Sequence, residues 1–128
     1  MSKPTPLGRR PTVVIVEDDS PLSGALIFAL EAEGFDVRTY AAATPLIERP
    51  VIADCLVVDL RLPDMDGLSL IAKLRERGIK APAILITTNP DERCRGAAND
   101  AGVQIVEKPL IDGELRRRIA EAIDGARA

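Results

Sequence analysis

Carboxylate side chains stand directly after two apolar, β-branched stretches of this sequence. Glu17 and Asp18 follow the first stretch, Asp59 follows a later one, and Lys108 comes shortly after the last. Three carboxylates held within a few ångströms of one another repel, and some of them must take up protons unless a cation lies between them. A hard divalent cation with oxygen ligands removes this repulsion, and Mg²⁺ is the cellular ion that these residue types favour.

The same residues could support phosphoryl chemistry. A carboxylate beside a bound cation can attack phosphorus as a nucleophile and become an aspartyl phosphate. The cation, an ammonium group and a hydroxyl group could then hold the three phosphoryl oxygens, and here Lys108 fits the ammonium role and Thr87 the hydroxyl role. Because the chain contains no histidine, an aspartate is the best phosphoryl acceptor that these residues offer.

Short β-branched segments alternate with segments of helical period along the whole chain. The helical spacing of apolar residues is clear in three segments and weaker in Ala41–Arg49, which contains Pro45. Strict alternation of five strands and five helices calls for right-handed crossovers and helices on both faces of a sheet. We therefore expect an α/β fold with a doubly wound five-stranded parallel sheet. The expected strands are Thr12–Val16, Val37–Tyr40, Leu56–Val58, Ala83–Thr87 and Val103–Val106.

Small polar residues, prolines and glycines mark the expected helix ends. Ser20 and Asn89 each precede a proline, as an N-cap residue before proline at the first helical position does. Asp66 and Asp112 precede glycines and are further N-cap candidates, and Asp64 is expected in the turn before Asp66. Three glycines fall where a helix should end and a strand begin, namely Gly34, Gly78 and Gly102.

The expected fold brings the chemically capable residues to one edge of the sheet. In a doubly wound sheet, ligands bind beyond the carboxyl ends of the strands, where the strand order reverses. If the first and third strands are neighbours, Glu17, Asp18 and Asp59 converge on one pocket. Thr87 and Lys108 then flank that pocket from the other side.

Composition excludes several function classes. The chain has 128 residues, the length of one ordinary domain, and its 46% hydrophobic and 29% charged residues exclude wholesale disorder. The 17 basic and 20 acidic residues give a net charge of −3, and aromatic residues are scarce, which argues against a dedicated nucleic-acid binder. With no histidine and only two cysteines, the chain offers no Ser-His-Asp triad, no histidine zinc ligand and no disulfide framework.

Neither a membrane span nor a secretion signal is indicated. The apolar runs are far shorter than the roughly 20 residues of a membrane-spanning helix. Residues 1–11 are polar and contain prolines, without the apolar core of a signal peptide. We expect a cytoplasmic domain over residues 12–126, preceded by a loose N-terminal arm at residues 1–11.

Four motifs resemble those of the receiver domain of two-component response regulators. Each motif alone is weak, but four in this order, at the ends of the expected strands, are strongly specific. The resemblance covers nearly the whole chain, from about Thr12 to Ala126. It implies a flavodoxin-like (βα)5 fold with strand order 2-1-3-4-5. The motifs are Val14–Asp19, Asp59–Gly67, Ala81–Thr87 and Glu107–Pro109.

The resemblance also assigns roles to the acidic residues. It implies that Asp59 is the phosphoryl acceptor. Glu17 and Asp18 match the acidic pair that holds Mg²⁺, and Asp59 and the backbone carbonyl of Arg61 match the further ligands.

Two more roles follow from the resemblance, and two positions depart from the family pattern. Thr87 matches the switch hydroxyl, and Lys108 matches the phosphate-binding lysine, whose bond to Pro109 is cis in the family. Three residues before the lysine the family usually has Tyr or Phe, whose aromatic ring moves between two positions. This chain has Ile105 there, which has no aromatic ring to move. Thr88 stands where the family usually has Ala or Gly, so it adds bulk near the phosphate.

A signalling switch rather than an enzyme is the function that the resemblance implies. A histidine kinase or a phosphotransfer protein would donate the phosphoryl group, and a downstream protein or output domain would respond. The chain itself would bind neither nucleic acid nor membrane. Homodimerisation through the face of the fourth helix, fifth strand and fifth helix is a family expectation.

Three alternatives remain open from the sequence. A receiver fold could act as an interaction module without phosphorylation. The departures from the family pattern at Ile105 and Thr88 leave this alternative open. A phosphatase of the haloacid-dehalogenase type would use an aspartyl nucleophile, but it needs a second aspartate where Arg61 stands. A flavin-binding domain of the flavodoxin type shares the topology, yet the chain lacks a Ser/Thr/Gly-rich phosphate loop.

Overall fold

Strands and helices alternate strictly through the computed structural model, which describes residues 10–110 and 113–127. The strands are β1 (Thr12–Val16), β2 (Asp36–Tyr40), β3 (Cys55–Asp59), β4 (Ala83–Thr87) and β5 (Gln104–Glu107). The helices within the described residues are α1 (Ser20–Ala32), α2 (Thr44–Glu48), α3 (Gly67–Glu76), α4 (Glu92–Asp100) and α5 (Glu114–Arg127). None of these helices is long and apolar enough to cross a membrane.

The five strands form one parallel sheet in the order β2-β1-β3-β4-β5. This order confirms the expected doubly wound, flavodoxin-like fold. β1 and β3 are neighbours, with Val16 opposite Val58, so the residues after these two strands emerge side by side. β4 and β5 are paired so that Thr87 lies opposite Glu107, which places the residue after Glu107 at the same edge.

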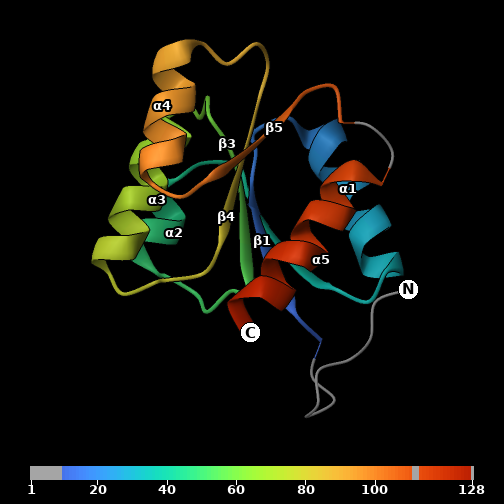
Figure 1. Cartoon of the computed structure of the whole chain (residues 1–128). Helices are drawn as coiled ribbons and strands as arrows, with labels where there is room; N and C mark the ends of the chain where they lie inside the picture. The colour runs from blue at the N-terminus through green and yellow to red at the C-terminus, as the bar shows by residue number, and fades with distance from the viewer. Residues whose placement is uncertain (1–9, 111–112, 128) are drawn as a thin grey trace.

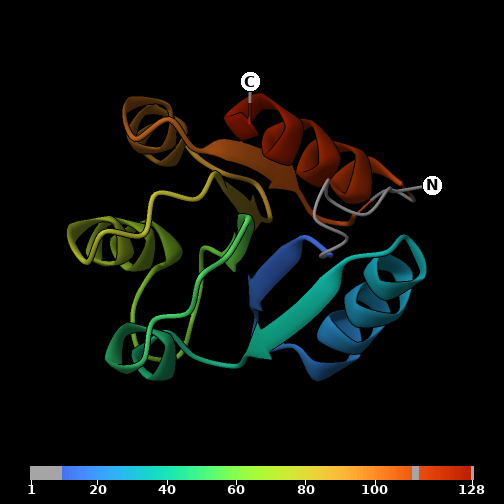
Figure 2. The same ribbon diagram turned by 90° about the horizontal axis from the view of Figure 1, so that it is seen from below.

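Helices cover both faces of the sheet. α1 and α5 lie on one face and α2, α3 and α4 on the other, as two views at right angles agree (Figure 1, Figure 2). Alternate residues of β1 serve the two faces: Val14 and Val16 pack towards α2–α4, and Val13 and Ile15 pack towards α1 and α5. All four are fully buried, and each such side chain stabilises the fold by about 1.5–3 kcal/mol.

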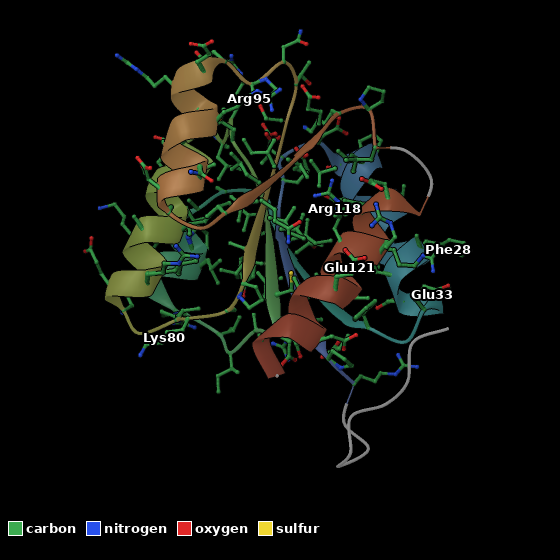
Figure 3. All side chains as sticks on the ribbon, in the orientation of Figure 1. Phe28, Glu33, Lys80, Arg95, Arg118 and Glu121 are labelled. Atoms are coloured by element: carbon green, nitrogen blue, oxygen red, sulfur yellow. The ribbon has the colours of Figure 1, made fainter. Side chains whose placement is uncertain are left out.

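The outer surface of α1 is apolar. Phe28 projects from α1 away from the sheet and is 80% exposed (Figure 3). The helix carries no charged residue before Glu31.

Two of the predicted helix caps are wrong by one or two positions. Asp19, not Ser20, caps α1, because Asp19 has an extended backbone and accepts from the N–H of Leu22, whereas Ser20 is already helical. Asp91, not Asn89, caps α4 and accepts from the N–H of Cys94 at 2.8 Å.

Other predicted helix ends agree with the structure. Asp66 caps α3, as expected. Gly34, Gly78 and Gly102 follow α1, α3 and α4 with φ of 97°, 88° and 69°, the left-handed backbone that glycine tolerates best. The fourth N-cap candidate, Asp112, lies outside the described residues.

The remaining differences concern the lengths of elements. α2 is shorter than the expected Ala41–Arg49 and spans only five residues. The expected N-terminal arm falls almost wholly on residues 1–9, outside the described residues. The carbonyl of Pro11, at its end, accepts from the N–H of Asp36 at 2.8 Å.

Candidate functional site

Three carboxylates meet at the carboxyl edge of the sheet. Glu17 follows β1 and Asp59 ends β3, and both are buried, with exposed fractions of 2% and 6%. Asp18 is exposed beside them. One carboxylate oxygen from each of the three lies within 4.8 Å of the others. The adjacency of β1 and β3 therefore creates the acidic cluster that the sequence predicts.

Lys108 joins this cluster from the end of β5. Its Nζ lies 2.8 Å from Oδ2 of Asp59 and 3.0 Å from Oε1 of Glu17. Its backbone N–H donates to the carbonyl of Thr87 at 2.8 Å, which ties the start of the loop to the end of β4. The peptide bond between Lys108 and Pro109 is cis, as the sequence resemblance implies. One ammonium group thus faces two buried carboxylates.

The second oxygen of Asp59 is oriented by the loop that follows β3. Oδ1 of Asp59 accepts from the backbone N–H of Arg61 at 3.0 Å. The N–H of Leu60 donates to the carbonyl of Ile86, so pairing with β4 continues one residue beyond β3. Both oxygens of Asp59 are therefore directed by neighbours in this arrangement.

Burial and charge shift the pKa values of two groups in the pocket. Burial raises the pKa of Glu17 above its ordinary value, and the nearby Asp59 raises it further, while the contact with Lys108 opposes the shift. For Lys108, burial alone would lower the pKa, but the contacts with Asp59 and Glu17 outweigh it and raise the pKa. Lys108 is therefore a cation at neutral pH.

The pocket has the properties of a site for a hard cation. Oε1 of Glu17 is buried and lies within ion-pair distance of Lys108, yet it accepts no hydrogen bond from the described residues. Its other oxygen, Oε2, accepts from the N–H of Asp19 at 3.1 Å. A buried carboxylate oxygen that accepts no hydrogen bond from the described residues, beside two more carboxylates, fits a divalent cation with oxygen ligands.

The other predicted site residues surround this cluster. Thr87 ends β4 and is buried, whereas Thr88 after it is exposed. Arg61 is exposed and turns its backbone N–H towards Asp59. Ile105, on β5, is half-buried and packs against the core on the α2–α4 side.

Asp64 makes a contact that the sequence did not predict. It was expected as a turn residue, but its carboxylate binds the N-terminal end of α2, at Ala43 and Thr44. These partners lie 20 and 21 residues earlier in the chain. No local sequence pattern signals a cap from such a distance.

Comparison with known families agrees with this fold and this edge. The family model described as response regulator receiver domain matches residues 13–120. The chain belongs to the response regulator receiver family. Receiver domains of response regulators are signalling switches rather than classical enzymes.

Curated receiver proteins cover most of this chain. It is 37% identical over 114 residues to the transcriptional regulatory protein FixJ of Rhizobium meliloti (strain 1021), across 87% of this chain and 56% of that protein. It is 38% identical over 117 residues to the phosphate regulon transcriptional regulatory protein PhoB of the same organism, across 85% of this chain and 50% of that protein. The chain thus spans about half the length of the curated relatives it matches.

Solved receiver structures share the fold over nearly the whole chain. The crystal structure of FixJ-N has a TM-score of 0.80 and 34% identity, covering 91% of this chain and 95% of that one. A CheY-like receiver domain protein from Methanospirillum hungatei JF-1 has a TM-score of 0.84 and 25% identity, covering 92% of this chain and 97% of that one.

Proposed function

We propose that this receiver domain accepts a phosphoryl group on Asp59 with Mg²⁺ bound, and that it then changes its protein partners. The observation that carries the proposal is the arrangement around Asp59. Its Oδ2 lies 2.8 Å from the ammonium group of Lys108, and its carboxylate shares one edge of the sheet with Glu17 and Asp18. A nucleophile, a phosphate-binding cation and a cluster of metal ligands are therefore within one pocket.

Transfer would proceed at the Asp59 carboxylate. One of its oxygens forms a bond to phosphorus while the bond from phosphorus to the donor's leaving group breaks, and the leaving group departs with the electron pair. When bound, Mg²⁺ would neutralise charge on a phosphoryl oxygen. Its ligands would be Glu17, Asp18, Asp59 and the carbonyl of Arg61.

Lys108 and Thr87 would hold the other phosphoryl oxygens. Lys108 already faces Asp59 as a cation, so its charge needs little rearrangement to meet a phosphoryl oxygen. Thr87 ends the neighbouring strand β4, from which its hydroxyl donates to the third oxygen. When Lys108 and Thr87 contact the phosphoryl group, they pull on the loops after β4 and β5. Because these contacts are absent without the phosphoryl group, phosphorylation biases the domain towards a second conformation.

The partners proposed here follow from the family. A histidine kinase or a phosphotransfer protein donates the phosphoryl group in the cytoplasm, and an output domain or a separate protein responds. The relatives FixJ and PhoB are named as transcriptional regulatory proteins, which supports an output in gene regulation. Homodimerisation through α4, β5 and α5 is part of this proposal, and Ile105 lies within that face.

The proposal is tested by intact-protein mass spectrometry after incubation with acetyl phosphate, with and without Mg²⁺. We expect a single phosphoryl adduct on the wild-type protein with Mg²⁺ and none on Asp59→Asn. Asp36→Asn, which changes an exposed aspartate at the opposite edge of the sheet, should keep the adduct. An equal adduct on Asp59→Asn would contradict the proposal, and no adduct on any protein would favour a phosphorylation-independent interaction module.

A further inference from the structure

One side chain fastens the loop after β3 to α2. In this loop, residues 60–66, Asp64 is the residue that reaches across. Its Oδ1 accepts from the N–H of Ala43 at 3.0 Å, and its Oδ2 accepts from the N–H of Thr44 at 2.7 Å. The hydroxyl of Thr44 donates to the same Oδ2 at 2.5 Å. Three donors at the N-terminal end of α2 therefore converge on a single carboxylate.

α2 depends on this carboxylate because it has no cap of its own. Ala43 stands at its N-cap position and has no side-chain acceptor for the N–H groups of the first turn. Asp64 supplies that acceptor as an anion, which gives stronger hydrogen bonds than a neutral group. The hydroxyl of Thr44, followed by the two backbone N–H groups, lowers the pKa of Asp64 to about 2.

α2 is in turn fixed to the body of the domain. Ala43 and Leu46 are buried in the core on the α2–α4 side, together with Val14 and Val16 of β1. A loop attached to the N-terminal end of α2 is thereby attached to the core beside the pocket.

The same loop carries a group that orients the phosphoryl acceptor. The N–H of Arg61 donates to Oδ1 of Asp59, and Arg61 pairs with Asp66 in an isolated antiparallel bridge. Asp66 is held by α3, since it accepts from both the N–H and the hydroxyl of Ser69. The loop is therefore fastened to α3 at its end and to α2 in its middle, through Asp64.

We propose that Asp64 is a positioning residue for the pocket: by fixing the loop to α2, it holds the backbone of Arg61 in place. There the N–H of Arg61 orients Asp59, and its carbonyl completes the ligands of the bound cation. This inference rests on the proposed function. Loss of the Asp64 contact releases the middle of the loop, while its two ends stay held at Leu60 and Asp66. The Arg61 backbone then samples other positions, and cation affinity falls.

Isothermal titration calorimetry of the full chain with MgCl₂ tests this role by measuring the affinity for Mg²⁺. We expect Asp64→Ala to weaken Mg²⁺ binding about ten-fold, the size of effect typical when a residue that supports a metal ligand is lost. Asp64→Asn should weaken Mg²⁺ binding less than Asp64→Ala does, since asparagine keeps one acceptor oxygen but replaces the other with a donor amide. Asp54→Asn is the matched control, because Asp54 accepts from the N–H of Thr12 at 2.7 Å at the opposite edge of the sheet.

Phosphorylation by acetyl phosphate at increasing Mg²⁺ gives the second readout. Asp64→Ala should need more Mg²⁺ for half-maximal rate but recover nearly the wild-type rate at saturation. Thr44→Val, which removes one of the three donors, should show a smaller increase in the Mg²⁺ concentration needed for half-maximal rate. This variant replaces Asp64→Ala in the test if Asp64→Ala does not fold.

If Asp64→Ala binds Mg²⁺ as tightly as the wild-type protein does, this inference alone is overturned, and Asp64 has a purely structural role. If Asp64→Ala does not fold, equal affinity in Thr44→Val and the wild-type protein has the same meaning. A rate that stays low at saturating Mg²⁺ would overturn it too. A wild-type protein that binds no Mg²⁺ would overturn the proposed function and this inference together.

Discussion

Replacement of Gly67 by alanine is expected to lower the free energy of unfolding by about 3 kcal/mol, the upper end of the range for overpacking a core. A Cβ atom at this position would lie 2.4 Å from the carbonyl oxygen of Asp59 and 2.8 Å from Cγ1 of Val58. Backbone atoms of β3 cannot yield as a flexible side chain does. The N–H of Gly67 also donates to the carbonyl of Leu60 at 2.7 Å, so the start of α3 cannot simply move away.

Thermal unfolding measures this effect. We expect the melting temperature of Gly67→Ala to fall by roughly 10 °C, and its phosphorylation to slow because the backbone of the acceptor Asp59 is displaced. The matched control is Gly96→Ala in α4, where a Cβ meets nothing within 4 Å. There alanine should stabilise the helix by up to about 1 kcal/mol. Equal melting temperatures for Gly67→Ala and wild type would contradict the close packing described for Gly67.

Replacement of Lys108 by alanine is expected to affect both stability and phosphorylation. It removes the ammonium group that faces Asp59 and Glu17, both buried. Because Lys108 is itself partly exposed, the loss in unfolding free energy should be about 2 kcal/mol, below the range for a fully buried pair. Loss of the cation that would hold a phosphoryl oxygen should slow phosphorylation by small donors about 100-fold.

The pH dependence of the Lys108→Ala protein follows from Glu17. Burial raises the pKa of Glu17 in the folded protein above its ordinary value, so the folded state holds this proton more tightly than the unfolded chain does. The Lys108 contact opposes that shift, and its removal should raise the pKa further. Because protonated Glu17 favours the folded state, its contribution to the free energy of unfolding is present at low pH and is lost as the pH rises through its folded-state pKa. The loss caused by Lys108→Ala should therefore be larger at about pH 7 than at about pH 5.

Urea unfolding at the two pH values measures this difference. Lys80→Ala serves as the control, because Lys80 is an exposed lysine between α3 and β4, far from the pocket (Figure 3). It should leave both stability and phosphorylation unchanged. A loss of stability in Lys108→Ala that is independent of pH would show that Glu17 and Lys108 are not coupled as described.

The strands could be predicted because buried parallel strands have a distinctive sequence pattern, whereas their order was implied by the resemblance to receiver domains. β1, β3 and β4 are short apolar runs followed at once by polar residues, and these polar residues define the edge of the sheet. Once β1 and β3 are neighbours, Glu17 and Asp59 must meet. The geometry of the acidic cluster therefore follows from strand order alone.

The helix caps could not be predicted to the residue, because neighbouring residues are chemically equivalent as caps. Asp19 and Ser20 both suit an N-cap, and only the extended backbone of Asp19, with φ −80° and ψ 101°, decides between them. At α4, Asn89 adopts a positive φ of 47° and so belongs to the turn before the helix.

The contact between Asp64 and α2 was out of reach for a different reason. It joins the β3–α3 loop to the N-terminal end of α2, which is distant in the sequence, and only the packing of α2 beside this loop brings them together. α2 has alanine at its N-cap position, which offers no side-chain acceptor, but this alone does not identify the partner.

The site of phosphorylation is the central claim, and borohydride reduction tests it most directly. An acyl phosphate on an aspartate is reduced to homoserine, which tandem mass spectrometry of peptides locates to a single residue. After incubation with acetyl phosphate and Mg²⁺, we predict homoserine at position 59 and aspartate retained at position 18. Homoserine at any other aspartate, or none at position 59, would contradict the assignment of Asp59 as the phosphoryl acceptor.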